Sequence, residues 1–162
     1  MMATAAFTGH RFGRFTLAQT RAVRIALSRT IERAKERGIT DFISGMAIGV
    51  DQWAAELVLD DPELCLICAI PCHEQYKRWS KEWRERWESI IARAHQVEYV
   101  HEGGYYSGCL NDRNKWMVDR ADVAIAIWDG GSGGTAHCVR YAQSKPIPVW
   151  RFNPVVAEYS RC

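Results

Sequence analysis

The chain has 162 residues, of which 48% are hydrophobic and 25% charged, the balance of an ordinary globular domain. This length favours one domain with one core, and the composition excludes intrinsic disorder. The net charge of +2 does not indicate a nucleic-acid binder, although a small anionic ligand needs only one or two cations. There is neither a long apolar run nor a basic-then-apolar leader, so we expect a cytoplasmic protein with no membrane partner.

The first predicted elements are a strand and a long helix. Residues 4–10 begin with an apolar run that breaks at Gly9, which is typical of a strand. Thr16 and Gln19 form a capping-box sequence at the start of a helix. Apolar side chains then recur at helical spacing up to Gly38, the predicted C-cap: Val23, Leu27, Ile31 and Ala34.

Strands and helices continue to alternate along the rest of the chain. The further strands are predicted at residues 41–44, 64–70, 96–100, 122–128 and 147–150, and the helices at 50–59, 79–94, 109–121 and 135–144. The strands are apolar on both faces, as expected where helices cover both sides of a parallel sheet. We therefore predict one α/β domain over residues 1–162, a doubly wound, mainly parallel sheet of Rossmann-like type. Residues 151–162 show no clear pattern of either a helix or a strand.

The six cysteines allow two interpretations. Without a secretory leader they do not indicate a disulfide framework. Cys65, Cys68, Cys72 and His73 have the look of metal ligands, but Cys65 and Cys68 lie three residues apart on a predicted strand and so point to opposite faces. We favour buried thiols that act as small apolar residues, and we expect no metal and no cofactor.

The helix at residues 79–94 carries a stripe of large apolar side chains: Trp83, Trp87, Ile90, Ile91 and Ala94. This stripe indicates a core or subunit contact rather than a base-stacking surface. Seven tryptophans give more apolar surface than one small sheet is expected to cover. We therefore predict a homodimer or larger assembly, with this helix as a candidate contact.

Three predicted strand-to-helix turns carry glycine and polar residues, at positions 8–11, 44–51 and 129–135. In a parallel sheet these turns share one edge, where the ligands of open α/β sheets bind. Glycine lets the backbone approach a ligand, and a helix start offers free N–H groups to a phosphate. Neither the P-loop nor the G-x-G-x-x-G motif fits. His10 and Arg11 replace glycines of the latter, either to contact a ligand or as solvated loop residues.

Several of these segments resemble one family. TGHR at 8–11, SGMAIGVDQWAAE at 44–56, AIPCHEQ at 69–75 and RNKWMVDRADVAIAIWDGGSGGT at 113–135 are similar to the YpsA-like branch of the SLOG superfamily, over roughly residues 5–150. That superfamily also contains the Smf/DprA recombination mediators and the LOG phosphoribohydrolases. The resemblance implies a Rossmann-like fold that binds nucleotides or nucleotide-derived ligands.

The resemblance also implies a set of pocket residues, which His10 and Gly130 from the same turns complete: Thr8, Gly9, Arg11, Ser44, Gly45, Met46, Asp51, Pro71, Asn114, Asp119, Asp129, Gly133, Gly134 and Thr135. Two of the carboxylates have alternative roles. Asp51 could orient a ribose or the neighbouring loop, or could simply complement the helix start. Asp119 could bind ligand or pair with Arg113 or Arg120.

One departure from the LOG enzymes concerns catalysis. Their PGGxGTxxE pattern ends in a catalytic glutamate, whereas Cys138 takes that place here and Asp129 replaces the proline. A thiol stabilises an oxocarbenium-like centre poorly. We therefore expect a protein that binds or senses a nucleotide-derived molecule, ADP-ribose-like, cyclic nucleotide-like or a nucleotide sugar. The alternatives are hydrolysis of nucleoside monophosphates, with Glu74, Asp119 or Asp129 as substitute, and DprA-like binding of single-stranded DNA, which the near-neutral charge makes the least favoured.

Overall fold

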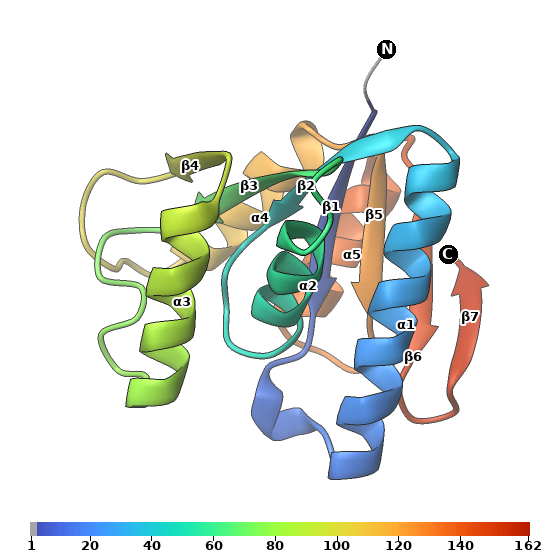
Figure 1. Ribbon diagram of the computed structural model, residues 1–162. Helices are drawn as coiled ribbons and strands as arrows, with labels where there is room; N and C mark the ends of the chain where they lie inside the picture. Colours follow the sequence, from blue (N-terminus) through green and yellow to red (C-terminus); the bar gives the residue numbers. More distant parts are fainter. Residues whose placement is uncertain (1–2) are drawn as a thin grey trace.

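The computed structural model describes residues 3–162, which build a single seven-stranded sheet in the order β4-β3-β2-β1-β5-β6-β7 (Figure 1). All neighbouring strands are parallel except β6 and β7, which form an antiparallel hairpin. The strands are β1 Ala3–Gly9, β2 Ile39–Ser44, β3 Cys65–Ile70, β4 Gln96–Tyr99, β5 Val123–Ile127, β6 Val149–Asn153 and β7 Glu158–Arg161.

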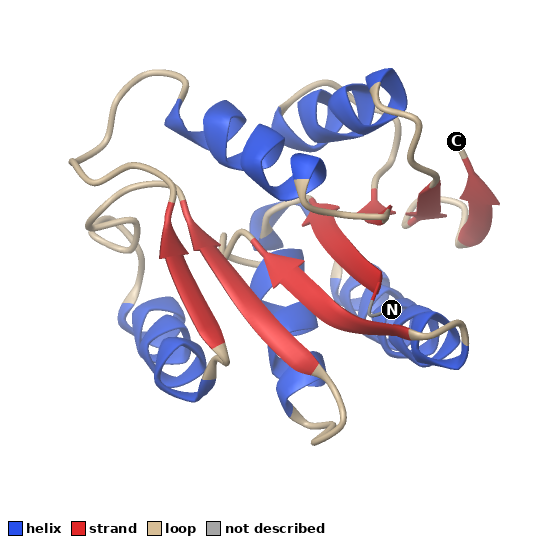
Figure 2. Cartoon of the chain, turned by 90° about the horizontal axis from the view of Figure 1, so that it is seen from above, coloured by secondary structure: helices blue, strands red, loops and turns tan. Residues whose placement is uncertain are grey.

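Helices cover both faces of the sheet, as Figure 2 shows from above. On one face lie α1 Leu17–Glu36, α2 Val50–Leu59 and α3 Lys81–Arg93, whose buried side chains join one large core with the strands. On the other face lie α4 Cys109–Asp119 and α5 Gly134–Ser144, which pack on two smaller clusters. A short 3-10 helix, η1 Phe12–Arg14, follows β1. The predicted doubly wound α/β fold is confirmed.

Local sequence signals account for the elements around the first helix. The Thr16 hydroxyl accepts the Gln19 N–H and the Gln19 side chain accepts the Thr16 N–H, so the predicted capping box forms. Gly38 follows the helix with a φ of 82°, a conformation that glycine adopts without steric cost. The predicted start of the helix is therefore confirmed, whereas the C-cap is Arg37 and Gly38 is the residue that follows it.

The central strand β5 is buried along its whole length, and the thiols of Cys68 and Cys138 are buried with the apolar side chains. Residues 151–162 differ from the prediction, because they extend β6 and form β7. All four residues of β7 are exposed, so the segment has no apolar alternation that would mark it as a strand. Its conformation comes from pairing with β6.

The tryptophan stripe of α3 lies within this protomer. Trp83 and Trp87 are only 8% and 7% exposed, and the Trp83 ring packs against Trp53 with a centroid distance of 6.1 Å. The stripe therefore packs in the core, which was the first of its two predicted roles. These buried tryptophans give no argument for a second copy bound at α3. Within residues 3–162, no helix combines the length and the apolar character needed to cross a membrane.

Candidate functional site

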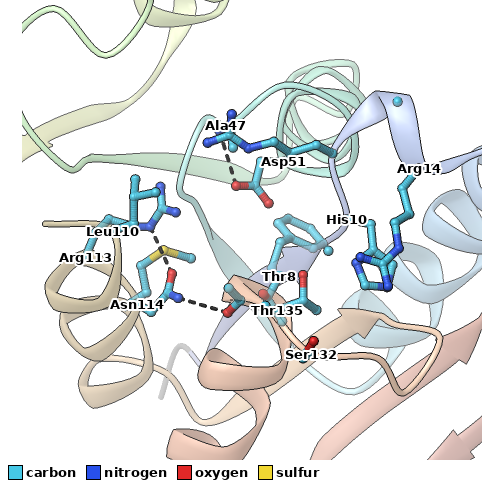
Figure 3. Close-up of a pocket in the computed structure, with 17 residues that line it drawn as sticks. Thr8, His10, Arg14, Ala47, Asp51, Leu110, Arg113, Asn114, Ser132 and Thr135 are labelled. Carbon is cyan, nitrogen blue, oxygen red and sulfur yellow. Dashed lines mark hydrogen bonds between the residues drawn. The ribbon is translucent and has the colours of Figure 1, made fainter. Parts of the chain in front are cut away.

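A cavity of about 420 Å³ lies at the carboxyl ends of β1 and β5, where the starts of α2, α4 and α5 meet (Figure 3). The site residues predicted from sequence that line it are Thr8, Gly9, His10, Arg11, Asp51, Asn114, Gly133, Gly134 and Thr135. The lining residues that were not predicted are Phe7, Gly13, Arg14, Ala47, Leu110, Arg113, Met117 and Ser132. The shared edge of the parallel sheet thus brings all three turns together, the second through Ala47 and Asp51.

The start of α5 forms an open, glycine-lined wall of the cavity. Gly133 has a φ of 129°, which a residue with a side chain rarely adopts, and a Cβ on Gly133 or Gly134 would meet no atom within 4 Å. His137 donates its N–H to the Gly133 carbonyl, so the N–H groups before it have no helical acceptor. The Asn114 side chain holds the Gly134 carbonyl at 3.2 Å. This geometry suits an anion.

Arg113 places a buried cation against the same cavity. Its side chain donates to the Gly45 carbonyl and, at 3.1 Å, to Asn114 Oδ1, and it is 6% exposed. None of the ion pairs within residues 3–162 includes this guanidinium. The Asp51 carboxylate interacts electrostatically with Arg113 but forms no ion pair with it. A buried charge without a direct ion-pair partner is costly, so this part of the site suits an anion.

Asp51 supplies a carboxylate on the opposite wall, at the start of α2. Its Oδ2 accepts the Ala47 N–H at 3.2 Å, whereas Oδ1 is buried and has no hydrogen-bond partner within the described residues. Burial raises the pKa of Asp51, against the opposing effect of Arg113, the Ala47 hydrogen bond and Arg11. A ligand hydroxyl or amine would satisfy the free oxygen.

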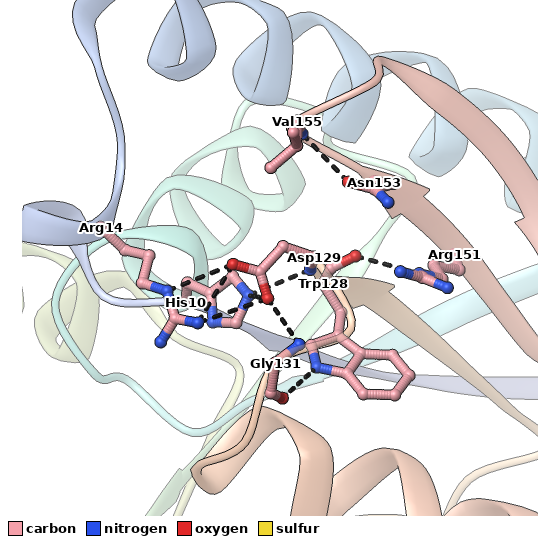
Figure 4. A network of polar contacts seen from close by, with 8 residues as sticks. All are labelled: His10, Arg14, Trp128, Asp129, Gly131, Arg151, Asn153 and Val155. Carbon is pink, nitrogen blue, oxygen red and sulfur yellow. Dashed lines mark hydrogen bonds and ion pairs between the residues drawn. The ribbon is translucent and has the colours of Figure 1, made fainter.

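His10, Arg14 and Asp129 connect the first and third turns (Figure 4). His10 Nε2 accepts the Asp129 N–H at 3.1 Å, and Arg14 forms an ion pair with the Asp129 carboxylate at 3.1 Å. Burial lowers the pKa of His10, which agrees with a neutral ring acting as acceptor. Burial opposes ionisation of Asp129, but the Gly131 N–H and the Arg14 charge hold its pKa below the usual value. The network fixes the glycine turn at the rim of the cavity, which His10 and Arg14 line and Asp129 does not.

Seven predicted site residues do not line the cavity: Ser44, Gly45, Met46, Pro71, Asp119, Asp129 and Gly130. Ser44 donates to the Asp51 carbonyl and accepts the Met46 N–H, so it builds the second turn. Met46 is fully buried with a φ of 61° and belongs to the core. Asp119 pairs with Tyr141 and Lys145 rather than with Arg113 or Arg120.

The proposed substitutes for the LOG glutamate are also displaced from the cavity. Cys138 is buried, and burial raises the pKa of its thiol to about 11. Glu74 is exposed beside Lys77. With Asp119 and Asp129 outside as well, Asp51 is the carboxylate among residues 3–162 that lines the cavity.

Helical spacing could have identified some of the missed residues. Leu110, Arg113, Asn114 and Met117 recur at intervals of three and four residues, so they share the face of α4 that meets the cavity. Arg113 was visible as part of the RN pair, but only its burial without an ion-pair partner among the described residues distinguishes it from a surface arginine.

The fold and this cavity define a Rossmann-like α/β domain with a cavity at the carboxyl edge of its sheet, where the ligands of open α/β sheets bind. The YpsA family, described as the YspA SLOG family, matches residues 5–146. The chain belongs to this SLOG family.

Relatives and solved structures agree with that assignment. The SPbeta prophage-derived protein YoqJ of Bacillus subtilis (strain 168) is 29% identical over 130 residues, covering 70% of this chain and 76% of YoqJ. A UPF0398 protein of Bacillus thuringiensis (strain Al Hakam) is 27% identical over 128 residues, covering 76% and 70%.

Two solved structures share the fold. DNA processing protein A from Helicobacter pylori, described with a single-stranded DNA binding mode, has a TM-score of 0.67 at 23% identity; the match covers 93% of this chain and 65% of that one. The molybdenum cofactor carrier protein of Chlamydomonas reinhardtii has a TM-score of 0.60 at 15% identity, covering 94% and 77%. The expectation that nucleic acid is not a partner gains no support from the first of these.

Proposed function

We propose that the cavity binds a nucleotide-derived small molecule and that the protein acts as a binding or sensing protein. The observation that carries this proposal is the buried Arg113, which makes no ion pair within residues 3–162 and lies beside an open helix start. A phosphate at this place would accept hydrogen bonds from the N–H groups of Gly133, Gly134 and Thr135. It would also give Arg113 a direct ion-pair partner.

The remaining polar groups match the rest of such a ligand. Arg11 lines the cavity and is exposed, so it is free to reach a phosphate from the first turn. Asp51 Oδ1 is a buried, unpartnered oxygen that suits a ribose hydroxyl. One wall thus offers donors for a phosphate, and the other offers an acceptor for a hydroxyl. This arrangement favours a nucleoside phosphate, an ADP-ribose-like molecule or a nucleotide sugar over an apolar ligand.

Hydrolysis of a nucleoside monophosphate is the alternative, and it would depend on Asp51. The raised pKa of this buried carboxyl suits a proton donor. However, the Cys138 thiol at the LOG glutamate position is buried and stays protonated. Release of free base from AMP, followed by chromatography, would support the hydrolase instead of the binding protein.

A thermal-shift panel of AMP, ADP-ribose, cyclic ADP-ribose, NAD and nucleotide sugars tests the proposal. A ligand at ~100 times its Kd stabilises the fold by about 2.7 kcal/mol. For a chain of this size that corresponds to a rise in Tm of roughly 5–11 °C. Single-stranded DNA is included at two salt concentrations, because phosphate-backbone binding weakens steeply with salt.

Two variants at one position separate charge from bulk. A side chain at Gly134 would enter open space, so both variants should fold. Gly134→Asp places a carboxylate against the phosphate and should abolish the shift, whereas the nearly isosteric Gly134→Asn should retain more of it. Equal binding by wild type and Gly134→Asp would place the phosphate elsewhere.

A further inference from the structure

The β6–β7 hairpin ends the sheet with an open edge. Within residues 3–162, β7 pairs with β6 on one side and no strand lies on its other side. All four β7 residues are exposed, including Tyr159 at 53%. Such an edge presents its N–H and C=O groups to another strand.

The register of the hairpin shows which backbone groups face outward. The Cys162 N–H donates to the Val149 carbonyl, so Cys162 faces β6. Because the direction of these groups alternates along an antiparallel strand, Ser160 and Glu158 also face β6. The N–H and C=O groups of Tyr159 and Arg161 therefore point away from the sheet.

We propose that β7 pairs antiparallel with β7 of a second copy of this chain, about a two-fold axis at Ser160. This register places Tyr159 of each copy opposite Arg161 of the other, and each such pair exchanges two hydrogen bonds. The outward N–H and C=O groups of Tyr159 and Arg161, four in each strand, then all have hydrogen-bond partners. Centring the pairing on Tyr159 instead would oppose Arg161 to Ala157, whose φ of 54° lies outside the strand region.

The side chains of this register are complementary as well. A two-fold axis perpendicular to the sheet places the α1 faces of both copies on the same side of the joined sheet. Tyr159 of one copy therefore meets Arg161 of the other on that side. An arginine beside an aromatic ring is a favourable cross-strand pair. Arg161 already lies near the Trp150 ring, 5.9 Å from its centroid, and Tyr159 packs 5.0 Å from Phe152. The second copy would continue this aromatic layer.

A groove on the same face adds contact area for a second copy. It has a volume of about 670 Å³ and lies between α1 and strands β5, β6 and β7, with Trp150, Phe152 and Tyr159 among its lining residues. Since both α1 faces lie on one side of the joined sheet, the grooves of the two copies adjoin. The assembly thus uses the edge opposite β4, and it does not depend on the proposed ligand.

Sedimentation velocity of the full chain tests the pairing. Wild type should sediment with twice the chain mass of 18.5 kDa at tens of micromolar. Tyr159→Pro removes an outward N–H that the hairpin does not use, and proline is tolerated at such edge positions. By symmetry this removes two intermolecular hydrogen bonds, so the dimer should dissociate at least about tenfold more readily. A wild type that is still monomeric at about 100 µM would overturn the proposal.

Cross-linking keeps the proposal testable if Tyr159→Pro fails to fold. Ser160 would face Ser160 of the second copy in a non-hydrogen-bonded pair, with Cα atoms about 4.5 Å apart, within reach of a disulfide. Ser160→Cys in a Cys162→Ser background should form a covalent dimer on mild oxidation with diamide. Glu158→Cys in that background is the matched control and should stay monomeric on denaturing gels. Equal cross-linking of both variants, or none at Ser160→Cys, would reject this register.

Discussion

Two glycine-rich turns at the same sheet edge have opposite characters. In the β2–α2 turn, a Cβ on Gly49 would lie 2.5 Å from the Phe12 nitrogen, and Met46 is fully buried. In the β5–α5 turn, a Cβ on Gly134 would meet nothing within 4 Å. Gly49 in the first turn makes room for the protein's own backbone, whereas Gly134 in the second leaves open space beside the cavity. Similar composition therefore does not imply similar function.

The largest effect that tests this comparison is expected in the free energy of unfolding of Gly49→Ala. The new Cβ clashes with backbone at a residue whose φ is 94°. Strain and overpacking each cost roughly 1–3 kcal/mol, so the free energy of unfolding should fall by about 2–6 kcal/mol. The matched control Gly134→Ala should be neutral or about 0.4–1 kcal/mol more stable. Urea unfolding measures the free energy of unfolding of both variants. An equal decrease in the two would contradict the difference between the turns.

Asp51→Asn should weaken ligand binding without destabilising the protein. A hydrogen bond to a charged group contributes about 1.5–3 kcal/mol, so a ligand hydroxyl should bind roughly ten- to a hundredfold more weakly. Because the pKa of Asp51 is raised above its ordinary value of 3.8, ionisation costs the folded state stability as the pH rises from that value. Titration calorimetry measures the binding of whichever nucleotide the thermal-shift panel identifies.

The stability of Asp51→Asn supplies the matching pH test. In urea unfolding, wild type should lose stability relative to the variant as the pH rises above 3.8, the ordinary pKa of the carboxyl group. A variant that is strongly destabilised at neutral pH and still binds normally would show that Asp51 only supports its own turn.

The smallest effect is expected from His10→Gln. The pKa of His10 is lowered from its ordinary value of 6.5 by burial, so the unfolded chain takes up a proton before the folded one does. The stability that a neutral His10 provides is therefore present above pH 6.5 and is lost as the pH falls below it. Glutamine retains an acceptor for the Asp129 N–H but does not titrate. Urea midpoints between about pH 5 and 7 should decline less for the variant, and parallel curves would contradict the neutral ring.

The sequence by itself determined how strands and helices alternate along the chain, and at which edge of the sheet the polar turns meet. Hydrophobic periodicity, the Thr16 capping box and Gly38 are local signals, and each had the expected structural result. The turn at residues 129–134 was also recognisable, because glycines directly before a helix are visible without knowledge of neighbours. For the same local reason, β7 was missed: its exposed residues take strand conformation only beside β6.

Only the tertiary structure decided which polar residues face the cavity. Met46 and Gly134 both lie in glycine-rich turns, yet one is core and the other lines the pocket. Arg113 reaches the site because α4 crosses the sheet beside Gly45, 68 residues earlier in the chain. Burial, counter-charges and free space depend on contacts between distant segments, so no local pattern reports them. That is the physical reason why the fold followed from the sequence while the charge arrangement of the pocket did not.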